Sequence, residues 1–545
     1  MNEMIKPNEW RRFIAAAIIG FLLFAALDLI PTIVSTTSGE LGGKVIEKAE
    51  AERLAASFAE QHLGMKVSES KAVHQTDKLM NGYLMKEELA KTYYEQYDSR
   101  FPTDTFQVEV SLEGKNYGFV YVHMQNGSVV AWNFNVDAHP MSDKEMSDSA
   151  AVFLEKQGFR SEELKNSKLR HDKVQGLIWS AAPAGFTIEE AKLNIDLALV
   201  ELNGEPVIAM YKPAFQVPDA YKKYVDKQDM YASVLTMVGY LLMSIVLCIL
   251  AIVYAILYRK FTSFKYGIIL TIIYFIAYCI TNLIMVDGVR ASLGEIADMD
   301  LTIMITMIFT IVVGIPMAAS IYISLVAGDG LWKAMGRNVW PRFKDAGYGE
   351  YVWRSARLGY LFALILFGLQ AVIFLILKLS IGTWNTSDAT QSPYNISALW
   401  LMPVLAWMAA IGEEAVFRMF GIGLFRKWFK NTFLACLPPT LFWALGHVMY
   451  PFYPATTRLF ELIIIGLAFC YIFMKYGYIT AVFTHAIFNT IAVSYSIIMV
   501  GSAFDIAAAV LFIVLPVLIA YVIRLLHNKK RQNPSVTTDP PLMQQ

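Results

Sequence analysis

Long runs of apolar residues recur through most of the chain after residue 230. Each run is long enough to cross a bilayer as a helix, which takes about 20 apolar residues. A further run, Phe13–Val34, follows Lys6, Arg11 and Arg12 near the N-terminus. It is too long for the apolar part of a signal peptide and no small-residue cleavage site follows it, so we interpret it as an uncleaved anchor. The pattern predicts about ten spans in all, the other nine near residues 231–257, 266–286, 301–327, 358–380, 396–424, 438–450, 457–474, 478–499 and 503–525.

Residues 35–225 have a different, mixed pattern that is typical of a soluble α+β domain. Ala51–Leu63 reads as an amphipathic helix with Leu54 and Phe58 on its apolar face and Gly64 as its stop. Alternating positions predict strands, and Asn126-Gly127 and Asn203-Gly204 are typical of tight hairpin turns. The expected strands are Phe106–Val110, Tyr117–His123, Val129–Val136, Leu193–Val200 and Val207–Tyr211.

A second helix is predicted from Ser142, where Ser-Asp-Lys-Glu forms a capping box, to Gly158. Its apolar stripe is Met146, Phe153 and Leu154. The order helix-then-strands therefore occurs twice, about 95 residues apart, which is a weak internal repeat. The two units are similar to paired PepSY-like modules. The domain has no catalytic cluster, and we expect its histidines at the surface: His62, His74, His123, His139 and His171.

Charge in the connecting loops indicates how the chain crosses the membrane. Among the loops with a clear charge bias, those rich in Lys and Arg, as in 333–357 and 426–430, alternate with loops that are neutral or acidic. Because cytoplasmic loops carry the excess of Lys and Arg, both termini are expected in the cytoplasm and residues 35–225 outside the cell membrane. The expected organisation is an anchor segment 1–34, an extracytoplasmic domain 35–225, helices and loops 226–395, a helical core 396–525 and a cytoplasmic tail 526–545.

Composition agrees with a multi-pass membrane protein. The chain has 545 residues, of which 56% are hydrophobic and 17% charged, and its mean hydropathy is +0.44; these values are too apolar for a soluble protein of this size. The formal net charge is zero, so nothing suggests a nucleic-acid partner. No C-x-x-C or H-E-x-x-H pattern occurs. The fold class is thus a polytopic α-helical membrane protein with an inserted α+β domain.

Ionisable residues inside one apolar run mark a candidate site. Glu413, Glu414 and Arg418 lie in the run at 396–424, where a charge at the bilayer centre costs about 2.5–3.5 kcal/mol. On a helix, Glu414 and Arg418 are i,i+4 neighbours and can pair. Glu413 then points about 100° away and lacks that partner. A buried ion pair would explain one glutamate and the arginine, but not the second glutamate.

Two later runs add polar residues. His447 lies in the run at 438–450, and His485 and Asn489 share one helix face in the run at 478–499. We expect the His447 helix to begin at Pro438-Pro439 rather than at Asn431, because proline suits the first helical turn. On that basis His447 and His485 lie about 12 Å from the cytoplasmic end of their helices, and the two glutamates about 16–18 Å. All would then lie at compatible depths.

The order Glu-Glu-x-x-x-Arg, aromatic-x-x-x-His and His-x-x-x-Asn resembles the CPBP family of intramembrane proteases, which includes type II CAAX-processing endopeptidases and bacterial bacteriocin-processing or immunity relatives. The resemblance covers roughly residues 396–500. Trp443 stands where phenylalanine is commoner, a departure that should leave the chemistry untouched. The resemblance implies hydrolysis of a peptide bond in a membrane-associated protein or peptide substrate.

The resemblance assigns roles to these residues. Glu413 and His447 would activate a water molecule, and His485 and Asn489 would donate hydrogen bonds to the oxyanion. Glu414, tied to Arg418, would orient His485 or fix the helix. The cofactor stays open, since Glu, His and His also resemble a ligand set for a divalent metal such as zinc, and the family is often called a metalloprotease.

Two other classes of function remain open. The polar residues would form a structural network in a catalytically silent membrane receptor or bacteriocin-immunity protein. A transporter would use Glu413 and Glu414 as a proton relay, but transporters usually show paired halves with matching broken helices, and here the polar residues are confined to one block.

Overall fold

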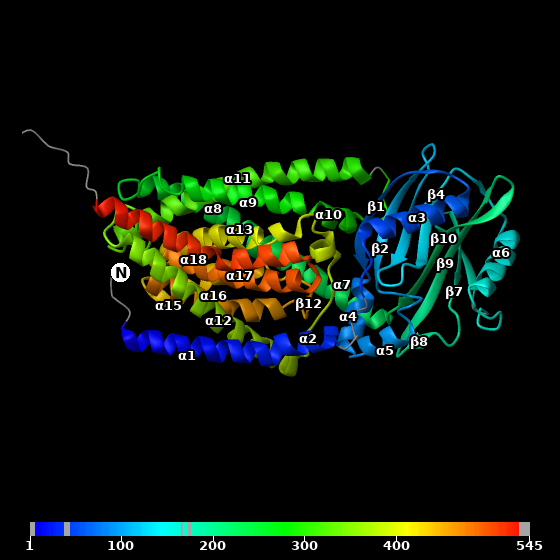
Figure 1. Cartoon of the computed structure of the whole chain (residues 1–545), viewed down its shortest axis with the longest axis horizontal. Coiled ribbons are helices and arrows are strands. Elements are labelled where there is room, and N and C mark those ends of the chain that lie inside the picture. Colours follow the sequence, from blue (N-terminus) through cyan, green and yellow to red (C-terminus); the bar gives the residue numbers. More distant parts are fainter. Residues whose placement is uncertain (1–5, 38–43, 165–166, 173–175, 298, 533–545) are drawn as a thin grey trace, which may run out of the picture.

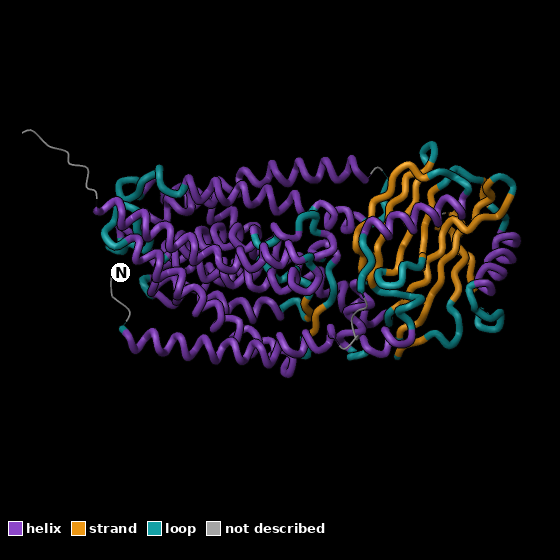
Figure 2. Tube along the Cα trace, viewed as in Figure 1, coloured by secondary structure: helices purple, strands orange, loops and turns teal. Residues whose placement is uncertain are grey.

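The computed structural model of the chain describes residues 6–37, 44–164, 167–172, 176–297 and 299–532. Figure 1 shows a bundle of long helices at one end of the molecule and a twisted sheet with its own helices at the other. Figure 2 shows the same division, with nearly all strands gathered beyond the ends of the long helices. We call these parts the helical bundle and the sheet domain (residues 44–216).

The bundle supports a polytopic helical membrane protein. Among the described residues, eight helices are long and apolar enough to cross a membrane, or nine if one bent pair counts as a span. The bent pair, α9 and α10, turns by 51°, and the predicted span near 438–450 is the short apolar helix α15. The segments are α1–η1–α2 (Pro7–Phe24, Ala25–Leu29, Ile30–Thr37), α7–η2–α8 (Asp219–Val234, Leu235–Leu242, Met243–Leu257), α9 (Ile268–Ile284), α10 (Val286–Leu293), α11 (Met299–Ala334), α12 (Tyr348–Ile381), α13–η6–α14 (Val404–Glu413, Glu414–Ile422, Gly423–Phe429), α15 (Thr432–Leu445), α16 (Thr457–Tyr476), α17 (Tyr478–Val500) and α18 (Ala503–Gln532).

The predicted start of the His447 helix is wrong. Helix α15 begins at Thr432, because the Asn431 side chain accepts a hydrogen bond from the Leu434 backbone N–H at 3.1 Å and caps the helix. Pro438 and Pro439 therefore lie inside the helix. Two prolines inside a helix remove backbone hydrogen bonds, and α15 ends at Leu445. His447 therefore lies in the turn after Leu445 rather than in the helix.

The sheet domain is built on one ten-stranded sheet. Its main path is β1-β2-β3-β4-β10-β9-β7-β6, and all its pairings are antiparallel. Helices α3 and α6 precede the two sets of strands, as the predicted repeat requires. The elements are α3 (Lys48–Leu63), β1 (Val67–Thr76), α4 (Lys78–Lys86), α5 (Ala90–Gln96), β2 (Asp104–Leu112), β3 (Tyr117–His123), β4 (Val129–Asn135), β5 (His139–Pro140), α6 (Asp143–Lys156), β6 (Ser167–Asp172), β7 (Gly176–Ala181), β8 (Thr187–Ile188), β9 (Ala191–Leu202) and β10 (Glu205–Gln216).

Most elements expected between residues 51 and 211 are confirmed. Gly64 ends α3 in the left-handed conformation, and Ser142 caps α6 with Glu145 as a capping box. The buried face of α3 differs from the expected one, however. It consists of Ala51, Ala55, Ala59 and Leu63, because a helix lined mainly with alanine approaches the sheet closely. Leu54 and Phe58 are only half-buried.

Ion pairs and hydrogen bonds join the sheet domain to the bundle. Arg290 of α10 pairs with Glu109 of β2, and its side chain is only 8% exposed. Lys212 of β10 pairs with Glu295 at 2.6 Å. Figure 1 shows α10 lying against the strands of this end of the sheet. These ion pairs join the two parts at more than one point and fix the position of the sheet domain on the bundle.

The histidines of the sheet domain are not all surface residues, so that expectation is wrong for His74 and His123. Both are buried. His74 lies at the junction with the bundle, where Nδ1 is 2.8 Å from Ser392 Oγ and Nε2 is 3.0 Å from Asp104 Oδ1. A histidine in a polar sequence is buried here because its two ring nitrogens find partners on both sides of the junction.

Candidate active site

The two glutamates lie at the point where the central helix changes its winding. Glu413 is the last residue of α13, and Glu414 is the first residue of the π-helical segment η6. Gly412 allows the Tyr274 ring to approach, since a Cβ there would lie 2.9 Å from Tyr274 Cε2. π-Helical turns occur often at functional sites. The sequence pattern predicts an ordinary helix here and does not reveal this widened turn.

Glu414 is fully buried and has two partners. Its Oε1 lies 3.2 Å from Arg418 Nη1, so the predicted i,i+4 pair is present. The same oxygen is 2.9 Å from His485 Nδ1. The Arg418 guanidinium also lies 4.2 Å from the centre of the Trp443 ring, a cation–π distance. The pair is thus enclosed by the bundle, and Glu414 joins Arg418 to a histidine 71 positions later in the chain.

Glu413 points away from Arg418, as the helical phase predicts. Its Oε1 is 3.9 Å from His447 Nε2, and its Oε2 is 3.8 Å from His485 Nε2. The Trp443 indole N–H donates a hydrogen bond to Glu413 Oε2. One half-buried carboxylate therefore faces two imidazoles. Both distances are longer than a direct hydrogen bond. Catalytic hydrogen bonds are often long in enzymes without bound substrate.

The contacts of the two histidines indicate that Nδ1 of each ring is a donor. His447 Nδ1 is 2.8 Å from the Trp443 carbonyl oxygen, and an oxygen acceptor requires a proton on that nitrogen. His485 Nδ1 likewise donates to Glu414 at 2.9 Å. In both rings Nε2 is therefore the atom directed at Glu413. Asn489 lies one turn beyond His485 on α17 and is half-buried.

Trp443 is the residue whose role the sequence analysis missed. Its indole N–H contacts Glu413, its backbone carbonyl contacts His447 and its ring covers Arg418. Phenylalanine has no N–H to donate, so the expectation that tryptophan here leaves the chemistry untouched did not take this contact into account and stays a prediction. The signal was present in the sequence, since tryptophan alone among the apolar aromatic residues carries a donor.

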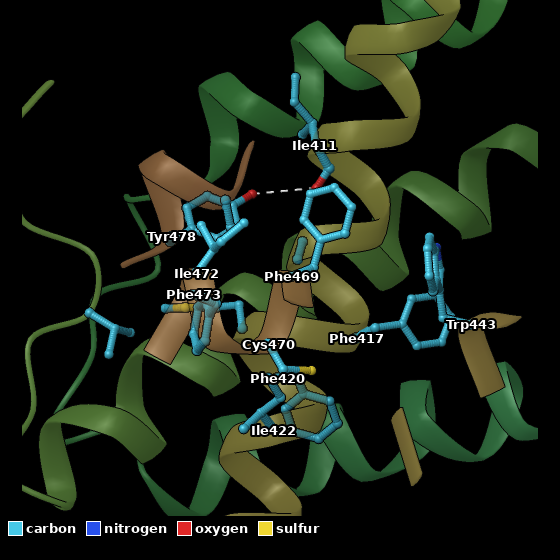
Figure 3. Close-up of a cluster of buried hydrophobic side chains, with 14 of the residues drawn as sticks. Ile411, Phe417, Phe420, Ile422, Trp443, Phe469, Cys470, Ile472, Phe473 and Tyr478 are labelled. Atoms are coloured by element: carbon cyan, nitrogen blue, oxygen red, sulfur yellow. Dashed lines mark hydrogen bonds between the residues drawn. The ribbon is translucent and has the colours of Figure 1, made fainter. Parts of the chain in front are cut away.

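Apolar side chains surround the polar cluster. Figure 3 shows a cluster of buried hydrophobic side chains that includes Ile411 and Tyr478, Phe417 and Trp443, and Phe469 and Phe473. The Tyr478 hydroxyl donates to the Ile411 carbonyl at 3.4 Å. Beside Glu413 lies a cavity of about 190 Å³ whose walls include Tyr240, Ser244 and Tyr274. Low-polarity walls strengthen electrostatic interactions among the enclosed groups.

The glutamate and the two histidines do not form a preformed metal site in this structure. Among the residues that the structure describes, no group of three or more His, Cys, Asp or Glu side chains has the arrangement of a metal site. Glu413 Oε2 is also engaged by the Trp443 N–H, which competes with a metal for that oxygen.

Comparison with known proteins bears on the same segment. Residues 395–491 match the family model for type II CAAX prenyl endopeptidase Rce1-like proteins. Comparisons with curated proteins and with solved structures found no match. The matched segment includes Glu413, Glu414, Arg418, His447, His485 and Asn489. The resemblance drawn from the three sequence motifs is therefore confirmed for this part of the chain, and the match supports an intramembrane endopeptidase of the CAAX type.

Proposed function

We propose that this protein is an intramembrane endopeptidase that hydrolyses a peptide bond of a membrane-associated protein or peptide substrate. The observation that carries the proposal is the position of Glu413, which faces Nε2 of both His447 and His485 at 3.9 and 3.8 Å. A buried structural ion pair needs only Glu414 and Arg418. It gives no reason for a second carboxylate between two imidazoles.

In this proposal Glu413 and His447 act as the base that removes a proton from water. The water oxygen attacks the scissile carbonyl carbon, forming a C–O bond, and the proton passes to Glu413. When the C–N bond breaks, the same proton passes to the leaving nitrogen, so that acid and base roles alternate on one pair. The hydrogen bond from His447 Nδ1 to the Trp443 carbonyl keeps Nε2 directed at Glu413.

In this proposal His485 and Asn489 stabilise the oxyanion. The hydrogen bond from His485 Nδ1 to the Glu414 carboxylate fixes the orientation of the ring, and the proposed donor to the oxyanion is a proton on its Nε2. The Asn489 amide, one turn further on the same helix face, supplies a second N–H. Donors held rigidly toward a developing negative charge lower the barrier without reorganising during the reaction.

The proposal includes an orientation. Both termini would lie in the cytoplasm, and residues 35–225 would lie on the opposite side of the cell membrane, as the Lys and Arg bias of the loops indicates. The sheet domain contains none of the six candidate residues, and we assign it a role in regulation or in selection of substrates.

The test compares the membrane proteome of cells that carry the wild-type chain with that of cells that carry Glu413→Gln. Turnover per folded molecule should fall by ~10²–10⁴ for Glu413→Gln and His447→Ala, and by ~10²–10³ for His485→Ala or Asn489→Ala. Glu461→Gln is the control, since Glu461 is another glutamate of the bundle, fully buried, that pairs with Arg458 instead of facing the two imidazoles. Full turnover in Glu413→Gln would show that the polar cluster is structural, as in a silent receptor.

A further inference from the structure

A large cleft lies where the sheet domain meets the bundle. Its volume is about 740 Å³, within the range of sites that hold drug-sized ligands. Its walls come from α4, from the turn between β8 and β9, from the start of α7, and from β11 (Trp384–Asn385), which lies in the loop after α12. The cleft therefore touches both parts of the molecule.

One wall of this cleft is aromatic. The rings of Tyr224 and Trp384 lie 5.8 Å apart, and those of Tyr221 and Trp384 lie 6.4 Å apart. Tyr83 extends the cluster, 5.3 Å from Tyr221. The indole nitrogen of Trp384 is buried and has no hydrogen-bond partner among the described residues. Aromatic faces carry partial negative charge and attract ammonium and guanidinium groups.

The cleft is also lined by carboxylates. Glu87, Glu189 and Glu190 line the cleft together with a single cation, Lys86. Lys86 pairs with Glu87, whereas Glu189 and Glu190 are exposed and form no ion pair within the described part of the chain. The cleft therefore carries an excess of two negative charges that its own residues leave uncompensated.

Lys86 shows what kind of group the cleft accepts. Its Nζ lies 5.9 Å from the centre of the Trp384 ring while it pairs with Glu87. An ammonium group is thus already held between an aromatic face and a carboxylate. The remaining two carboxylates and three tyrosine rings provide the same chemistry for a second cation.

We propose that this cleft binds a short basic peptide, with a lysine or arginine side chain held between the aromatic wall and the carboxylates of Glu189 and Glu190. The volume accommodates more than one side chain, which favours a peptide of a few residues over a single small ion. The excess of negative charge disfavours phosphate, nucleic acid and acidic peptides by the same electrostatics.

The cleft is also connected to the turn that carries His447. Tyr221 and Tyr224 belong to α7, which continues directly into η2. There Gly239 packs against Leu445, and Tyr240 packs against Gly446: a Cβ on either glycine would lie within 2.6 Å of its neighbour. These contacts place the helix from the cleft against the two residues that precede His447.

A second connection reaches the other side of His447. In β11, Trp384 pairs with Tyr453 of β12 (Phe452–Tyr453), and their rings stack at 5.7 Å. The Tyr453 hydroxyl donates to Asp229 of α7 at 2.7 Å. A ligand that moves or tightens Trp384 and Tyr224 therefore acts on both ends of the segment 446–453, and so on the position of His447.

The binding test uses the full chain in lipid nanodiscs and labelled trilysine, with triacetyllysine and triglutamate as probes of the same size. We expect saturable binding of trilysine alone, weakened by added salt because exposed charges are screened. The double variant Glu189→Gln, Glu190→Gln should weaken binding by about tenfold or more. Glu205→Gln is the matched control, an exposed glutamate at the other end of β9 and β10, and should bind as the wild type does.

The connection to His447 is tested by hydrogen exchange in the segment 446–456 with and without trilysine. We expect slower exchange with trilysine in the wild type and no change in the double variant. Equal binding of trilysine and triacetyllysine, or no saturable binding, overturns the proposed site. Binding without any change in exchange overturns the connection. Neither readout requires proteolysis, so the result stands apart from the outcome of the Glu413 experiment.

Discussion

The indole N–H of Trp443 donates a hydrogen bond to the carboxylate of Glu413. The backbone carbonyl of the same residue accepts a hydrogen bond from His447 Nδ1 at 2.8 Å. One residue thus orients both members of the proposed water-activating pair. Phenylalanine at this position would retain only the second contact. The tryptophan therefore adds a hydrogen bond that orients the Glu413 carboxylate.

Trp443→Phe tests this relationship directly. The phenyl ring still covers Arg418, but the donor to Glu413 is lost. A hydrogen bond to a charged group contributes about 1.5–3 kcal/mol, so kcat should fall by about tenfold to a hundredfold, while KM stays near its wild-type value. Steady-state kinetics on protein reconstituted in lipid would measure both constants.

Trp428→Phe is the matched control for this variant. Trp428 also donates its indole N–H, to the Tyr254 hydroxyl at 2.8 Å, but lies outside the polar cluster. Its replacement should leave kcat unchanged. Equal losses in the two variants would mean that Trp443 acts only through general packing.

Arg418→Ala should reduce the amount of folded protein as well as the activity. The change leaves Glu414 without its cationic partner in a fully buried position, at a cost of about 3–5 kcal/mol. Thermal unfolding in detergent should show a lower Tm for Arg418→Ala. Arg524→Ala removes a partly exposed pair with Glu350 and should change stability by only about 0–1 kcal/mol. An unchanged Tm for Arg418→Ala would contradict a structural role for the pair.

The sheet domain should lose stability as the pH falls through about 6.5. Burial lowers the pKa of His62 below its usual value, and His62 stacks on Phe58 at 5.2 Å. The unfolded chain therefore takes up a proton at a higher pH than the folded chain. Stability from this residue is complete above the unfolded pKa and is lost as the pH falls toward the folded pKa.

Hydrogen exchange around residues 58–63 at several pH values would measure this loss. In His62→Gln the side chain no longer titrates, so its pH dependence should be flatter than that of the wild type. Identical slopes for the two proteins would assign the pH dependence to other groups.

The proposed orientation predicts which part of the chain a protease can reach from outside intact cells. The connecting loops with Lys and Arg would be protected, and cleavage should be confined to residues 35–225. Detection of fragments by mass spectrometry would locate the cuts. Cleavage at Lys529 in intact cells would place the tail outside and reverse the orientation.

Local chemistry was enough to predict most of the elements. Apolar runs indicated the long helices, because only a helix satisfies its own backbone hydrogen bonds in lipid. The turns at Asn126-Gly127 and Asn203-Gly204 were readable because Gly127, Asn203 and Gly204 have positive φ, which these residue types tolerate. The pair between Glu414 and Arg418 followed from the i,i+4 spacing alone.

The arrangement of the candidate site was decided by packing between distant segments. Glu414 meets His485 across 71 positions, and Trp443 meets Glu413 across 30. The burial of His74 depends on Ser392, which lies 318 positions later. A side chain's neighbours along the chain determine its helix or strand. The packing of whole helices decides which distant group completes the side chain's hydrogen bonds. That packing could not be predicted from any one stretch of the sequence.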